Sequence, residues 1–424
     1  MKDLKKTLYL GLGLGVKLLT GLYAVKLCAQ YLGPESFGIT GQLSSLLSVI
    51  SLLAGAGVSV GITKVYAGSD FPHEQRPHWL QAARKLVFGS AALLALLVVL
   101  LSGWISKHLF NSIEQAHWLL WGLLVSILPI GYGGIGQGKI NGLYRDDLYS
   151  ISMVSGSMLG LAGLWIGGIY FGPAGALLAM IWLPVAQAIV MSGFASRLVE
   201  PAARVVAGTA SVKSKARFLL GYGALSIAAG AIMPIVYIVI RLLIQTHSDN
   251  EIFGLWQATL RISEAYCQLP LLLLSVVLFA RFAGSASVSL DYRTVAKTYL
   301  FIVCLMTCIA AFVYLARTFW IKIVFTPDFL PMEDFVPWQL AGDTLRIISY
   351  LGTTILAARG KVKVCVFAEV LQGALLLFFS AVLIPAYAEY GAYYAYLVSY
   401  ALYFSVTVIL LCWYNKPCVP NRAA

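Results

Sequence analysis

Hydrophobic residues recur in long stretches along this chain and are separated by short polar segments. An apolar run of about 20 residues is long enough to cross a bilayer as an α-helix. Runs of that length follow one another through the whole sequence, so the pattern predicts a polytopic helical membrane protein. About twelve transmembrane helices are expected, with approximate spans 7–32, 38–66, 81–107, 116–138, 149–170, 174–198, 215–244, 254–280, 294–316, 335–358, 363–385 and 391–414.

Composition supports an all-α membrane fold. The 424 residues are 60% hydrophobic and only 11% charged, and the mean hydropathy is +0.83. Soluble domains are closer to half apolar and a quarter charged. The short polar segments therefore leave no room for a sizeable soluble domain.

Basic residues fall on one side of this predicted topology. If the N-terminus is cytoplasmic, twenty-two of the 30 Lys and Arg residues lie in cytoplasmic segments. The opposite side holds only Lys107, Arg241, Arg317 and Lys322. The positive-inside rule predicts such a bias, so both termini are expected on the cytoplasmic side of the membrane. The net charge of +12 then reflects topology rather than nucleic-acid binding.

An internal repeat is visible at an offset of 216 residues. Phe37-Gly38 begins the second run and Phe253-Gly254 begins the eighth, while Gly175-Ala176 and Gly391-Ala392 begin the sixth and the twelfth. The repeat predicts two six-helix bundles, at 1–198 and 215–424, joined by a cytoplasmic linker at 199–214. Parallel repeats of this kind usually rock against each other around a site near the bilayer midplane. The architecture therefore predicts a transporter.

Two of the predicted membrane helices carry polar stripes at spacings of 4, 3 and 4 residues. The eighth run contains Gln257, Arg261, Glu264 and Gln268. The tenth run contains Gln339, Asp343, Arg346 and Tyr350. Such spacings place each set on one helical face and its acid and base within pairing distance. Charges within a membrane helix normally face the bundle interior or a wet cavity.

Further charges are expected near the same cavity. Lys17 and Lys26 lie in the first run and Glu369 in the eleventh. The two lysines lie on opposite faces of an ideal helix, about 180° apart around its axis. They line one cavity only if that helix bends. A central cavity containing all these residues would have one more basic than acidic group, which suits an anionic ligand such as a phosphate with sugars. Alternatively, the two acid–base pairs only lock helices together.

Other motifs in the sequence predict no metal or cofactor. The segment "GGIGQGKI" at 133–140 lacks the Ser or Thr of a phosphate-binding loop, and its glycines favour helix packing instead. The seven cysteines show no disulfide or metal-ligand spacing. The five histidines all lie in loops or near helix ends.

Residues 15–68 resemble a known family. The segment "GVKLLTGLYAVKLCAQYLGPESFGITGQLSSLLSVISLLAGAGVSVGITKVYAG" is similar to the Wzx family of bacterial polysaccharide flippases, especially the branch that moves enterobacterial common antigen. "AGDTLRI" at 341–347 and "AARGK" at 357–361 are similar to later landmarks of that family. The resemblance covers nearly the full length, and it extends to the superfamily that also contains MATE-type multidrug exporters.

The resemblance implies two six-helix bundles around a central cavity. The substrate it implies is undecaprenyl diphosphate carrying an oligosaccharide repeat unit, of enterobacterial common antigen or O-antigen type. The family's basic cavity residues correspond to Lys17, Lys26 and Arg261, with Arg346 less closely matched. Membrane lipids and the polysaccharide polymerase and chain-length regulator proteins are the implied partners. Two other classes remain open, an ion-coupled drug exporter and a non-transporting scaffold of polysaccharide assembly.

Overall fold

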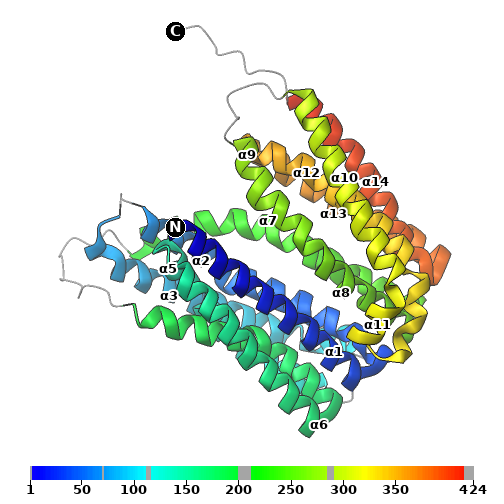
Figure 1. Ribbon diagram of the computed structural model, residues 1–424. Coiled ribbons are helices and arrows are strands. Elements are labelled where there is room, and N and C mark those ends of the chain that lie inside the picture. The colour runs from blue at the N-terminus through cyan, green and yellow to red at the C-terminus, as the bar shows by residue number, and fades with distance from the viewer. Residues whose placement is uncertain (1, 69–70, 111–115, 199–211, 284–290, 415–424) are drawn as a thin grey trace. The chain divides into compact units, whose positions relative to one another are not determined.

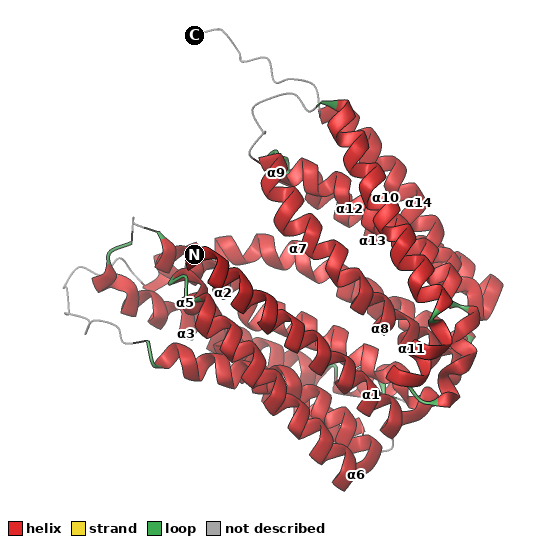
Figure 2. Ribbon diagram, in the orientation of Figure 1, coloured by secondary structure: helices red, strands yellow, loops and turns green. Residues whose placement is uncertain are grey.

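The computed structural model describes residues 2–68, 71–110, 116–198, 212–283 and 291–414. Every regular element in these ranges is a helix (Figure 2). Contacts divide the chain into two units, residues 1–238 and 239–424, and each unit is described by itself. The predicted linker at 199–214 lies mostly outside the described residues, and the predicted domain boundaries stay predictions.

The N-terminal unit is built from long helices connected by short turns (Figure 1). Its elements are α1 (Lys2–Ser51), the π-helix η1 (Leu52–Ala56), α2 (Gly57–Ala67), the 3-10 helix η2 (His73–Gln75), α3 (Arg76–Leu100), α4 (Ser102–Leu109), α5 (Ala116–Gly142), α6 (Asp146–Ser196) and the first part of α7 (Val212–His247).

Two helices of this unit are too long for a single crossing. α6 has 51 residues, and a straight helix of that length would extend about 75 Å, more than twice the hydrocarbon thickness. The backbone leaves helical geometry at Gly172 (φ 57°, ψ −140°). The chain then doubles back, because Gln187 Nε2 donates to the carbonyl of Ser152 at 3.1 Å. The predicted break between 170 and 174 is therefore confirmed.

A second long helix is broken in the same way. α1 leaves helical geometry at Gly33 (φ 62°, ψ 176°). Positive φ is readily adopted only by glycine, so the residue type fixes where this helix can turn. The break falls between the predicted spans 7–32 and 38–66. α1 and α6 are thus each divided near the break that the hydrophobic pattern predicts.

The glycines of "GGIGQGKI" pack helices together, as the sequence predicts. A Cβ built on Gly133 would meet Ala188 of α6 at 2.5 Å. A Cβ on Gly134 would meet the carbonyl oxygen of Gly55 at 2.6 Å. Small residues allow helix backbones to approach closely in membranes. α5 therefore packs against α6 on one side and against η1 on the other.

The C-terminal unit contains the remaining crossings. After the end of α7 it comprises α8 (Asn250–Leu272), the π-helix η3 (Leu273–Leu278), α9 (Phe279–Ala283), α10 (Tyr292–Leu315), α11 (Arg317–Val324), the 3-10 helix η4 (Pro327–Asp334), α12 (Val336–Ala358), α13 (Val362–Tyr387), the 3-10 turn η5 (Ala388–Tyr390) and α14 (Gly391–Tyr414). Its core includes Ile302 and Met306 of α10 packed with Ile347, Leu351 and Ile355 of α12.

The internal repeat is visible in local geometry. A Cβ on Gly175 would meet the carbonyl oxygen of Gly167 at 2.0 Å, and a Cβ on Gly391 would meet that of Leu383 at 2.3 Å. In both units the last helix of the repeat therefore begins tightly against a carbonyl eight residues earlier. The second helix of each repeat is also interrupted by a π-helix, η1 in the first and η3 in the second.

Seven segments of the described residues are long and apolar enough to cross a membrane. Three of them, of 41, 51 and 53 residues, have the length of two crossings. α8 and α12, which carry the predicted polar stripes, are not among the seven. The chain is a multi-pass membrane protein, and the two helices that carry the predicted polar stripes both lie in the C-terminal unit.

Candidate functional site

A buried carboxylate joins three helices of the C-terminal unit. Asp343 lies in the middle of α12 and is 0% exposed. The hydroxyl of Tyr266 on α8 donates to its Oδ2. The hydroxyl of Tyr396 on α14 donates to its Oδ1 at 2.7 Å. Gln339 Nε2, one turn earlier on α12, donates to both carboxylate oxygens at 3.3 and 3.2 Å. The carboxylate is therefore stabilised by donors from α8, α12 and α14.

Arg346 lies on the other side of the Tyr396 hydroxyl. Its Nη1 donates to that oxygen at 3.5 Å, and its Cζ lies 5.6 Å from the centre of the Tyr350 ring. The described contacts thus connect the predicted partners Asp343 and Arg346 through a tyrosine. Glu369 of α13 is partly buried.

The predicted pair on α8 is confirmed. Arg261 Nη1 lies 2.8 Å from Glu264 Oε2, and the two side chains are 18% and 53% exposed. One turn earlier, Gln257 is fully buried and its Oε1 accepts from Arg241 Nε at 3.1 Å. The α8 stripe therefore divides into a buried amide and a more accessible ion pair.

The lysines of α1 stay on different faces of one regular helix. Lys17 is exposed and Lys26 is partly buried. The only break inside α1 is at Gly33, beyond both residues. A bend that would bring the two lysines onto one face is therefore not present between them. Both belong to the N-terminal unit, whereas the other six predicted site residues belong to the C-terminal unit.

Tyr266 and Tyr396 are polar residues of this site that sequence reasoning missed. The signal for Tyr396 is present in α14, where Tyr393, Tyr396, Tyr400 and Tyr403 follow spacings of 3, 4 and 3. All four are among the buried residues of the unit. Within an apolar run such tyrosines are easily interpreted as core or interfacial anchors. Only the folded structure shows that one of them reaches Asp343.

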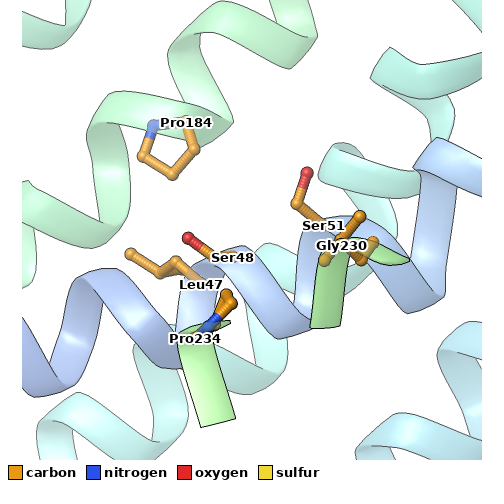
Figure 3. Close-up of a pocket in the computed structure, with 7 residues that line it drawn as sticks. Leu47, Ser48, Ser51, Pro184, Gly230 and Pro234 are labelled. Atoms are coloured by element: carbon orange, nitrogen blue, oxygen red, sulfur yellow. The ribbon is translucent and has the colours of Figure 1, made fainter. Parts of the chain in front are cut away.

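The N-terminal unit contains a pocket of different character (Figure 3). Its volume is about 500 Å³, and it lies between α1, η1, α6 and α7. Leu47, Ser48 and Ser51 of α1 face Pro184 of α6, with Gly230 and Pro234 of α7 completing the wall (Figure 3). No charged residue lines it. The buried charges of the C-terminal unit have no counterpart in this pocket.

No group of three or more His, Cys, Asp or Glu side chains that could hold a metal ion occurs in the described ranges. The arrangement offers donors, acceptors and charges inside a bundle of membrane helices, without a nucleophile–base pair among the contacts described. The fold and the site define a polytopic helical membrane protein with charged and polar side chains inside its C-terminal unit.

Comparison with known proteins identifies the family. Residues 27–334 match a family described as polysaccharide biosynthesis protein, and the chain belongs to that family. The lipid III flippase of Escherichia coli (strain K12) is 28% identical over 407 residues, covering 95% of this chain and 96% of that protein. The lipid III flippase of Shigella flexneri gives the same values.

Solved structures show the same fold. An inward-facing multidrug resistance MATE family transporter of the MOP superfamily aligns with a TM-score of 0.67 and 16% identity, covering 95% of this chain and 96% of that one. The lipid II flippase MurJ in an inward closed conformation aligns with a TM-score of 0.70 and 14% identity, covering 95% and 87%. The predicted MATE-like, all-helical architecture is confirmed.

Proposed function

We propose that this protein flips undecaprenyl-diphosphate-linked oligosaccharide repeat units from the cytoplasmic to the periplasmic leaflet of a bacterial inner membrane. The observation that carries the proposal is the nearly full-length similarity to lipid III flippases within a polysaccharide biosynthesis family. The repeat unit would be of enterobacterial common antigen or O-antigen type. Transport would follow alternating access of two six-helix bundles.

The charged residues suit the head group of such a substrate. A diphosphate with sugars cannot enter about 30 Å of hydrocarbon without polar partners. Arg261 is partly accessible and is paired with an exposed carboxylate, so it can exchange Glu264 for a phosphate oxygen. Lys17, which is exposed on α1, is a second basic contact. The polyprenyl tail would remain in the lipid.

The remaining predicted site residues have supporting roles in this proposal. Gln257 is buried and Lys26 is less accessible than Lys17, and they would line the path or fix its walls. Asp343 is buried, whereas Arg346 and Glu369 are partly buried, and all three would contribute polar groups to the same path. The expected partners are the membrane lipids, together with polymerase and chain-length regulator proteins that use the flipped units.

Reconstitution tests the proposal directly. The purified protein is placed in vesicles that contain a defined undecaprenyl-diphosphate-linked oligosaccharide, and a membrane-impermeant glycosidase reports how much substrate reaches the outer leaflet. We expect faster exposure than in protein-free vesicles. Dye efflux without flipping would instead identify a drug exporter. Neither activity, from folded protein, would favour a scaffold.

A further inference from the structure

Two short helices occupy equivalent positions in the internal repeat. α4 follows α3 in the N-terminal unit, and α11 follows α10 in the C-terminal unit. The repeat offset of 216 residues maps Trp104 of α4 onto Trp320 of α11, and Ile105 onto Ile321. Each short helix therefore contains the same local sequence, a tryptophan followed by an isoleucine.

The bends that lead into these helices are also alike. Leu101, directly after α3, has φ −92° and ψ 3°, and Ala316, directly after α10, has φ −100° and ψ 14°. The carbonyl of each bend residue accepts a hydrogen bond from the short helix that follows. The donor is the amide of Ile105 at 2.8 Å in α4 and the amide of Trp320 at 3.0 Å in α11. The sequence repeat is thus matched by a repeat in backbone geometry.

The length of the preceding helices places α4 and α11 at the level of the lipid head groups. α3 has 25 residues and α10 has 24, and at the usual rise they extend about 38 and 36 Å. The hydrocarbon layer is about 30 Å thick, so each long helix has crossed it before its short successor begins. Within the C-terminal unit, α11 lies at the end opposite to α9, which leads to a predicted cytoplasmic segment (Figure 1).

Each short helix buries one face and exposes another. Ile105 and Leu109 of α4 are buried, as is Ile321 of α11. The side chains of Trp104 in α4 and Phe319 in α11 are 47% and 58% exposed. Exposed aromatic side chains combined with lysines are typical of helices that lie in the interface between lipid and water. Both short helices therefore have the surface of an interfacial helix.

Basic residues are rare on this side of the predicted topology, where the sequence places only Lys107, Arg241, Arg317 and Lys322. Arg241 is buried and donates to Gln257. The other three lie on α4 and α11, which have eight residues each. The positive-inside rule disfavours bases on this side. Their concentration on two equivalent helices is therefore a local exception to the charge pattern of the chain.

Within the described ranges, two of these three bases have no counter-charge. Arg317 Nε lies 3.8 Å from Glu333 Oε2, and its Nη1 donates to the carbonyl of Tyr314 at 3.0 Å. Lys107 and Lys322 are exposed, and no ion pair of the described residues includes either of them. Their ammonium groups are carried on flexible side chains and can therefore reach an anion outside the chain.

We propose that α4 and α11 bind the phosphate groups of anionic phospholipids in the leaflet that faces away from the cytoplasm, through Lys107 and Lys322. The exposed aromatic side chains place both helices in lipid, where phosphate groups are the nearest anions. A zwitterionic head group carries its own cation, so a head group with a net negative charge complements these lysines better. This binding is independent of the flipping proposed above.

Lipid titration followed by native mass spectrometry tests these sites in the purified full-length protein. Dioleoyl phosphatidylglycerol should bind more tightly than dioleoyl phosphatidylcholine. Lys107→Gln and Lys322→Gln should each weaken one phosphatidylglycerol site about fivefold. Arg317→Gln is the matched control, because it removes the same charge from α11 at a residue that lies beside Glu333. It should bind phosphatidylglycerol as the wild type does.

Four results would overturn the proposal. Equal binding of the two lipids would mean that the charge of the head group is not recognised. An equal loss in Arg317→Gln would indicate a general charge effect instead of direct contact by the lysines. Wild-type binding by both lysine variants would leave an acidic protein surface as the partner of these helices. Competition by glycerophosphoglycerol, the same head group without its chains, would identify a site for soluble phosphates.

Discussion

At the scale of single residues, the carboxylate of Asp343 is the shared acceptor of three hydrogen-bond donors. Asp343→Ala would leave the hydroxyls of Tyr266 and Tyr396 and the amide of Gln339 without their acceptor, at about 1–3 kcal/mol for each buried donor left unsatisfied. Asp343→Asn keeps one acceptor oxygen and should lose less. We expect this order in chemical unfolding of the detergent-solubilised variants.

Tyr396 should be energetically coupled to Asp343. Tyr396→Phe removes the hydroxyl that connects Asp343 to Arg346. In the Asp343→Ala background that hydroxyl has already lost its acceptor, so the second change should cost less. The double variant should be more stable than the sum of the single effects predicts, by about 0.5–3 kcal/mol. Additive effects would mean that this hydrogen bond contributes nothing.

Arg261 should matter for transport more than for folding. Its pair with Glu264 is partly open to solvent, and exposed pairs contribute only about 0–1 kcal/mol. Arg261→Ala should therefore leave the amount of folded protein in the membrane nearly unchanged while abolishing flipping. Arg317→Ala, which breaks another ion pair of the same unit at 3.8 Å, is the control and should flip normally. Normal flipping by Arg261→Ala would refute its role as a diphosphate contact.

At the scale of elements, the turn inside α6 depends on one glycine. Gly172 has φ 57° and ψ −140°, a combination that residues with a Cβ rarely adopt. Gly172→Ala should destabilise the protein by about 1–3 kcal/mol. Gly193, in the same helix, has open space around its Cα and no positive φ, so Gly193→Ala should be neutral or stabilising by up to about 1 kcal/mol. The melting temperatures of the Gly172→Ala and Gly193→Ala variants in detergent should show this difference.

The long helices could be predicted from the sequence because the thickness of the bilayer determines their length. Membrane thickness sets run length, so the hydrophobic pattern correctly predicted long apolar helices and the breaks near Gly33 and Gly172. It missed η1 and η3, because a π-helix changes backbone hydrogen bonds without changing hydrophobicity. It also merged the short helices α4 and α11 into neighbouring runs or loops. Those breaks depend on local packing, which periodicity does not record.

The candidate site was predictable only within one helix at a time. Spacing along α8 correctly predicted that Arg261 and Glu264 pair. The hydrogen bonds of Asp343 run to residues 77 and 53 positions away, and no local pattern contains such contacts. The tyrosines of α14 also lie in an apolar run, where their rings fit a core interpretation. Their hydroxyl partners became visible only with the packing of α8, α12 and α14.

At the scale of the whole molecule, the charge pattern predicts how the chain crosses the membrane. Twelve crossings with a cytoplasmic N-terminus place the segments near 70, 205, 288 and 361 on the cytoplasmic side. Basic residues cluster near all four, including Arg204, Arg293 and Lys361. Because an odd number of crossings in the first half would reverse every later segment, the position near 205 is the most informative.

Reporter fusions after residues 70, 205, 288 and 361 measure this topology in cells. A cytoplasm-active reporter should be active at all four positions, and a periplasm-active reporter at none. A fusion after Lys107, at the opposite end of the predicted third helix, is the control and should give the reverse result. The expected pattern requires an even number of crossings before 205, as two parallel six-helix repeats demand. A periplasmic signal at 205 would leave the two halves with opposite orientations, and the rocking of two parallel bundles would then have to be abandoned.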